Sequence, residues 1–152
     1  MPCACRGGEE KAAAARGPMF MPAGPTRPPG IDELQALAER ALRAIPPELV
    51  RHVRDVVIRV EEFPDAETER EMALESPFDL MGLYRGVALD QKGVADVVHD
   101  LDMIFLYRRP ILDYWCETDQ DLYGLVRHVL IHEIGHHFGF SDADMEAIET
   151  PP

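Results

Sequence analysis

The chain has 152 residues, a length that suits one domain built around a single hydrophobic core. Its net charge at pH 7 is −13, and residues 1–30 carry more basic than acidic side chains, so the acidic excess belongs to residues 31–152. An acidic surface repels phosphate backbones and anionic lipids, so nucleic acid and membranes are not expected as partners. Solubility is the simplest explanation of this charge, and a preference for basic peptides is the alternative.

The first part of the chain differs in composition from the rest. Residues 1–30 are rich in proline and glycine and show no amphipathic period, so we expect a disordered tail there and one folded domain over residues 31–152. No apolar run has the length of a signal peptide or of a membrane-spanning helix. The three cysteines are an odd number and give no disulfide framework. We therefore expect a cytoplasmic protein.

Two elements are predicted at the start of the domain. Residues 31–45 repeat apolar side chains at helical spacing, and Pro46 and Pro47 end the run, which predicts an amphipathic helix. Residues 53–62 alternate in a run rich in β-branched side chains and stop before Pro64, which predicts a strand.

The middle of the chain is less regular. Residues 65–76 are compatible with a short helix or a loop. The runs DLMGLYRGVAL and DMIFLYRRPIL are expected to be two further extended segments, and the second stops at Pro110.

A long apolar helix is the best-defined element. Thr118 and Asp121 have capping-box spacing, the helix then runs through DQDLYGLVRHVLIHEIGHHF, and Gly139 stands where a left-handed C-terminal cap is expected. A second capping box, Ser141 with Asp144, predicts a short terminal helix.

Histidines gather in the long helix, at His128, His132, His136 and His137. His132 and His136 are one turn apart, a spacing that lets both imidazoles reach a single Zn²⁺. Glu133 is too far round the helix to be a third ligand, but it is placed to hydrogen-bond a metal-bound water. Gly139 allows the chain to reverse, so that Asp142 can fold back as the third ligand.

These residues form the pattern H132-E133-x-x-H136-x-x-G139-x-x-D142, which resembles the extended zincin signature in its aspartate form. The surroundings are similar to the small bacterial zincin-like metallopeptidase family, in which strands like LMGLYRG and IFLYRRPIL precede the active-site helix. The resemblance covers residues 31–150. It implies an α/β (α+β) fold with a small mixed sheet packed against a long active-site helix, an N-terminal helix and a short C-terminal helix. It also implies a Zn²⁺ cofactor held by His132, His136 and Asp142, with Glu133 as the catalytic residue.

The neighbouring polar residues are assigned other roles. His128 is expected to be a partly exposed surface residue or a neighbour of the ligands, because three ligands on one helix ridge cannot surround an ion tetrahedrally. His137 points away from the pair and is expected to be structural or to line the cleft. Glu146 and Glu149 follow the motif too closely to approach from a separate helix, as the glutamate ligand of gluzincins does.

Three further side chains are expected in the core. The chain ends too soon after the motif for the methionine turn of the larger metzincins, so Met145 is interpreted as a core residue. Tyr84 and Tyr107 are candidate donors to an oxyanion, although aromatic residues on strands more often pack in the core.

The pattern predicts a zinc-dependent metallopeptidase that acts on a peptide or protein substrate by means of a metal-activated water and the base Glu133. The alternative is a non-catalytic module that binds peptides or proteins and is only stabilised by zinc. Glu133 favours the enzyme, because a purely structural zinc site has no need of a base.

Overall fold

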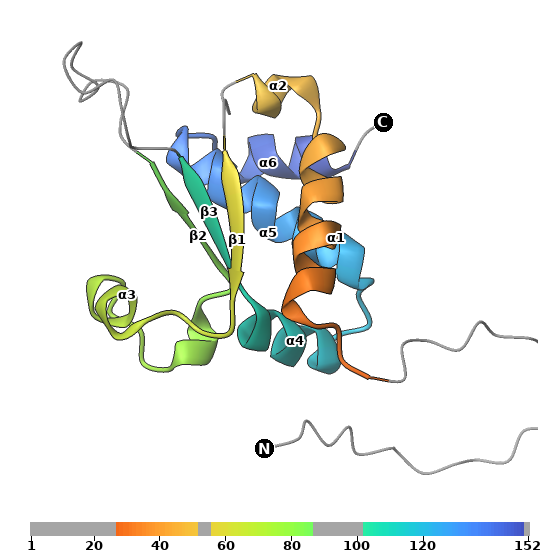
Figure 1. The fold of residues 1–152 in the computed structure, drawn as a ribbon. Helices are drawn as coiled ribbons and strands as arrows, with labels where there is room; N and C mark the ends of the chain where they lie inside the picture. Colours follow the sequence, from red (N-terminus) through yellow and green to blue (C-terminus); the bar gives the residue numbers. More distant parts are fainter. Residues whose placement is uncertain (1–26, 52–55, 87–101, 151–152) are drawn as a thin grey trace, which may run out of the picture.

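The computed structural model describes residues 27–51, 56–86 and 102–150. Its elements are α1 (Ile31–Arg43), α2 (Pro47–Val50), β1 (Val57–Glu61), α3 (Ala66–Glu71), the 3-10 turn η1 (Pro77–Asp79), β2 (Gly82–Arg85), β3 (Met103–Tyr107), α4 (Arg108–Glu117), α5 (Leu122–His137) and α6 (Asp142–Glu149). A small sheet and the helices around it form one mixed α/β unit (Figure 1). The predicted fold class is confirmed.

The sheet has three strands in the order β1-β3-β2. Strand β1 runs parallel to β3, with Val57 opposite Met103, whereas β2 runs antiparallel to β3, with Gly82 opposite Leu106. A parallel pair needs a long connection, and here the chain from β1 to β3 includes α3 and β2. Strand β2 thus lies at an edge of the sheet and next to helix α5.

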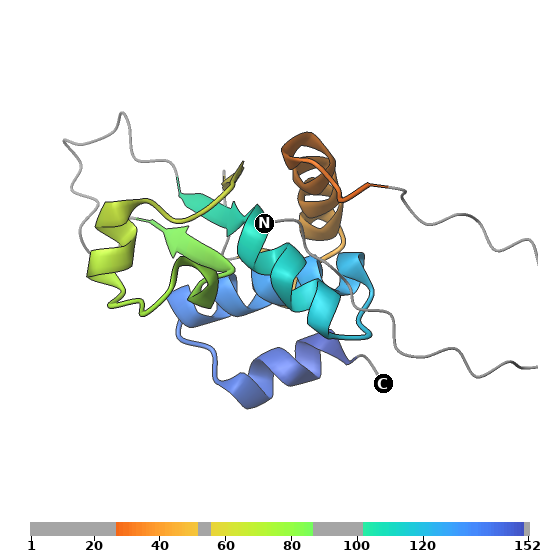
Figure 2. The same cartoon turned by 90° about the horizontal axis from the view of Figure 1, so that it is seen from below.

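One hydrophobic core joins the sheet to α1 and α5 (Figures 1 and 2). Alternate residues of β1 and β3 point into it, and α1 contributes one apolar face. Helix α5 carries apolar side chains on nearly all of its faces, because α1, β2, α4 and α6 all pack on it and cover these side chains. Its buried residues are Leu125, Val126, Val129, Leu130, Ile131, Ile134 and Gly135.

The terminal helix α6 packs closely against α5 at Gly135. A side chain on Gly135 would collide with Met145, whose Cγ lies 2.7 Å from the position of the added carbon. Met145 is fully buried, as expected for a core residue. The absence of a side chain at Gly135 therefore lets α6 lie directly on the helix that carries the histidines.

The structure corrects the prediction for the start of the long helix. Residues 108–117, for which no helix was predicted, form the separate helix α4, and Thr118 is its C-cap and not the N-cap of the long helix. Helix α5 begins at Leu122, and Asp121 is its N-cap, since the Asp121 carboxylate accepts a hydrogen bond of 2.9 Å from the Gly124 N–H. The helix that carries the histidines is thus shorter than predicted.

The third extended run was also predicted too long. Strand β3 ends at Tyr107, and Pro110 lies in the first turn of α4, where a missing N–H costs no intrahelical hydrogen bond. A short helix, α2, was not predicted. Pro47 was expected only to end the first helix, but it also occupies the first position of α2, where proline is favoured.

Other predictions are confirmed within the described residues. The first helix, the strands β1 and β2 and the capping box of Ser141 and Asp144 are all present. Gly139 has a φ of +78°, the left-handed conformation expected after the long helix. Most of the predicted tail lies outside the described residues, as do parts of the first two predicted strands. No helix in the described segments is long and apolar enough to cross a membrane.

Candidate metal and active site

The structure brings together the three residues predicted to hold zinc. His132 and His136 project from α5, and Asp142 is the first residue of α6. One ligand atom from each lies within 4.8 Å of those of the other two. The left-handed turn at Gly139 reverses the chain between the two helices, which returns Asp142 to the histidines.

Local hydrogen bonds distinguish Asp142 from its neighbour Asp144. The Asp144 carboxylate accepts hydrogen bonds from the backbone N–H and the hydroxyl of Ser141, at 3.0 and 2.6 Å. These contacts lower the pKa of Asp144, which acts as the return half of the capping box. Asp142 precedes it in the first turn, where its exposed carboxylate stands near the histidines.

Glu133 lies on the flank of α5 that faces strand β2. The backbone N–H of Tyr84 donates a hydrogen bond to its carboxylate, which favours the charged form, but burial outweighs this and raises the pKa of Glu133 to about 7. Gly82 makes this close approach possible, because a side chain there would come within 3.2 Å of Glu133 Cγ. A carboxyl group with a pKa near neutrality can both accept and release a proton at physiological pH.

The surroundings of His132 favour its neutral form. Burial lowers the pKa of His132, and the positive charges that His128 and His136 can carry act in the same direction. Neutral imidazole is the form that binds a metal. The donors present, two imidazole nitrogens and one carboxylate oxygen, are those of catalytic zinc sites with three protein ligands and one open position.

Tyr84 and His137 pack against each other beside this site. Their rings stack with centroids 3.9 Å apart, and the Tyr84 hydroxyl donates a hydrogen bond of 2.8 Å to Asp102. Burial, and then this carboxylate, raise the pKa of Tyr84. Tyr84 and Tyr107 are both buried, at 8% and 2% exposure, which confirms the prediction of core residues.

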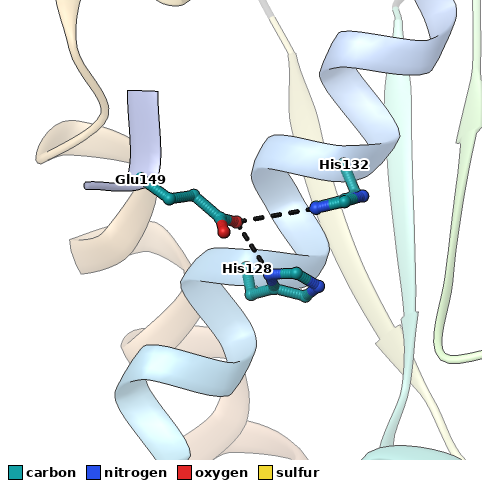
Figure 3. Close-up of side chains that lie close together, drawn as sticks. All are labelled: His128, His132 and Glu149. Atoms are coloured by element: carbon teal, nitrogen blue, oxygen red, sulfur yellow. Dashed lines mark ion pairs between the residues drawn. The ribbon is translucent and has the colours of Figure 1, made fainter. Parts of the chain in front are cut away.

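One expectation about this region was wrong. Glu149, at the end of α6, does approach the histidines from a separate helix, because α6 runs back along α5. Its Oε1 lies 2.8 Å from His128 Nδ1 and 3.8 Å from His132 Nε2 (Figure 3). His128 therefore has a specific acidic neighbour, and only the packing of α6 reveals it.

A model of the zincin-like metallopeptidase family matches residues 53–151. The chain belongs to this family. The match runs from the region of β1 to the end of α6 and contains the whole histidine motif, whereas α1 lies outside it although α1 shares the core. No curated protein matches the chain closely enough to count as a relative. The family resemblance seen in the sequence is confirmed.

Proposed function

We propose that this protein is a zinc-dependent metallopeptidase in which His132, His136 and Asp142 bind the metal and Glu133 is the general base. The observation that carries the proposal is the arrangement around α5. Three side chains that could hold a metal ion converge on one side of the helix, and the partly buried Glu133, with a pKa of about 7, lies on the adjoining flank. Membership of a metallopeptidase family supports the same chemistry.

The three donors suit zinc in kind and in exposure. His136 and Asp142 are exposed and His132 is partly buried, so an ion among them would keep a side open to water and substrate. A structural zinc site is closed by four protein ligands, which this set does not supply. When bound, zinc would polarise the scissile carbonyl and lower the pKa of a water molecule to about 7.

Glu133 would then move the protons of the reaction. Its carboxylate takes a proton from the attacking water and later gives it to the leaving amine, so the peptide bond and water become a carboxylic acid and an amine. The raised pKa suits both transfers. The neighbouring Tyr84 N–H favours the charged form of this carboxylate, which is the form that accepts the proton from water.

Strand β2 is the proposed binding place for the substrate. It lies at the edge of the described sheet, and its residues Gly82 and Tyr84 contact Glu133. An extended peptide can add to such an edge as a further strand, which would bring its backbone to the catalytic residue. The expected substrate class is therefore an extended peptide or an unstructured protein segment.

The substitution Glu133→Gln tests the proposal. It removes the base but none of the proposed ligands, so the variant should keep its zinc while cleavage of a peptide mixture, followed by mass spectrometry, is lost. Glu146→Gln, on the exposed side of α6, is the matched control and should leave both unchanged. Turnover by Glu133→Gln would refute the assignment. Zinc binding by the parent chain without any cleavage would favour the non-catalytic peptide-binding module.

A further inference from the structure

A second set of metal-binding side chains lies on the same ridge of α5, one turn before the first. It consists of His128, His132 and Glu149, whose ligand atoms also lie within 4.8 Å of one another (Figure 3). The set takes two residues from α5 and one from the end of α6. Like the first, it offers two imidazoles and one carboxylate, and it shares His132 with that set.

The spacing of these atoms fits a zinc ion. Ligands bound tetrahedrally at 2.0–2.1 Å lie roughly 3.3–3.4 Å apart. The two distances from Glu149 Oε1, 2.8 Å to His128 Nδ1 and 3.8 Å to His132 Nε2, lie on either side of that value. The two imidazole rings also lie close, with centroids 4.0 Å apart.

One carboxylate oxygen of Glu149, Oε1, has no hydrogen-bond partner among the described residues. This oxygen is buried from solvent, and His128 Nδ1 is near. A buried carboxylate oxygen is costly without a hydrogen bond, a protonated partner or a metal. This oxygen faces two imidazole nitrogens, and a cation bound by all three atoms would remove the cost.

The shared residue makes the two positions exclusive. A neutral imidazole has one nitrogen that can accept, so His132 can bind only one ion at a time. We propose that His128, His132 and Glu149 form an alternative zinc position, and that zinc held there withdraws His132 from the set with His136 and Asp142. The chain would thus hold one ion in either of two places, and only one of them has the three donors proposed for hydrolysis.

The alternative position is open to solvent from one side. His128 is 46% exposed, and together with Glu149 it lines a surface pocket of about 360 Å³, whose other walls include Gly124 and Arg127 of α5 and Thr150. Zinc can therefore enter this position without passing the first. The open side also leaves room for the water that would complete four ligands.

Zinc titration by calorimetry tests the proposal on the full chain, stripped of metal beforehand. The double variant His136→Ala/Asp142→Ala lacks the first set and should still bind one zinc per chain. Adding either Glu149→Gln or His128→Asn to that background should abolish the binding, whereas adding Glu146→Gln should not. The parent chain should bind one zinc, not two.

The results separate this proposal from the proposed function. It is overturned if the double variant binds no zinc, if both Glu149→Gln and His128→Asn leave that binding intact, or if the parent binds two ions. Glu149→Gln and His128→Asn are each expected to abolish zinc binding in the double variant. Circular dichroism shows whether either change disrupts the fold, and if one does, the other still tests the proposal. Failure of peptide cleavage by the parent would refute the enzyme and leave this titration unaffected.

Discussion

Gly82 allows strand β2 to lie close to helix α5, and its replacement by alanine should separate the two. A methyl group at this position would lie 2.7 Å from Val129 Cγ1, 3.2 Å from Glu133 Cγ and 3.3 Å from the carbonyl oxygen of Phe105. Val129 is 4% exposed and has a stiff β-branched side chain, and the Phe105 oxygen belongs to the backbone of the central strand. Neither neighbour can move away at low cost.

The size of the effect follows from two opposing contributions. Overpacking of a core costs about 1–3 kcal/mol, whereas replacing glycine by alanine stabilises by about 0.4–1 kcal/mol through the unfolded chain. These ranges leave a net loss of about 0–2.6 kcal/mol in the free energy of unfolding, and the 2.7 Å contact with buried Val129 places Gly82→Ala in the upper half of that range. Val129→Ala removes the methyl group that collides, so the double variant should be more stable than the sum of the single effects by more than about 0.5 kcal/mol.

Urea unfolding followed by circular dichroism, with metal removed by a chelator, measures these free energies for the parent, both single variants and the double variant. The chelator ensures that only packing is compared. The reasoning is refuted if Gly82→Ala is as stable as the parent, or if the effects of Gly82→Ala and Val129→Ala simply add.

Three further predictions concern the site. Asp142→Ala should lower kcat/KM for peptide cleavage by orders of magnitude, while Asp144→Ala, whose carboxylate is engaged by Ser141, should retain it. Tyr84→Phe removes the hydrogen bond to Asp102 and should lower the free energy of unfolding by about 1.5–3 kcal/mol with little change in kcat. A fall in kcat at unchanged stability would instead show that the Tyr84 hydroxyl donates a hydrogen bond to the oxyanion of the reaction. Free zinc at 100 times its Kd should stabilise the chain by about 2.7 kcal/mol, so chelation should lower the melting temperature in calorimetry, and an unchanged temperature would contradict zinc binding.

The parts of the site that the sequence predicts are those encoded within a few residues. His132 and His136 are four residues apart, which in a helix already means one face, and the capping box at Ser141 with the glycine at 139 specifies the turn that follows. This local geometry was enough to predict that Asp142 approaches the histidines, and the structure brings the three side chains together.

The contact of Glu149 with His128 could not be predicted in the same way. It depends on the direction in which α6 packs, and that direction depends on Met145 filling the space left by Gly135. The side chains of His128 and Glu149 are 21 residues apart in the sequence, and no periodic pattern connects them. In the sequence, the only indication of how α6 packs is the glycine at position 135, which leaves room on α5 for a large side chain such as Met145.

Helix α4 was missed because short apolar runs are ambiguous. The residues from Met103 to Leu112 are apolar or aromatic except for Arg108 and Arg109, and a short apolar run of this kind is compatible with a buried strand and with a buried helix. Pro110 was interpreted as an end, although in the first turn of a helix proline removes no hydrogen bond. In the structure this proline lies in the first turn of α4, and Ile111 and Leu112, which follow it in the helix, are buried.

Zinc-dependent cleavage by the unmodified chain tests the central claim most directly. A mixture of unstructured peptides is incubated with the protein as purified, after chelation, and after zinc is restored, and new peptide termini are identified by mass spectrometry. The proposed mechanism predicts new termini with the zinc-loaded protein, their disappearance on chelation and their return with zinc. Termini that persist without metal, or that form in none of the three samples, would contradict a zinc metallopeptidase.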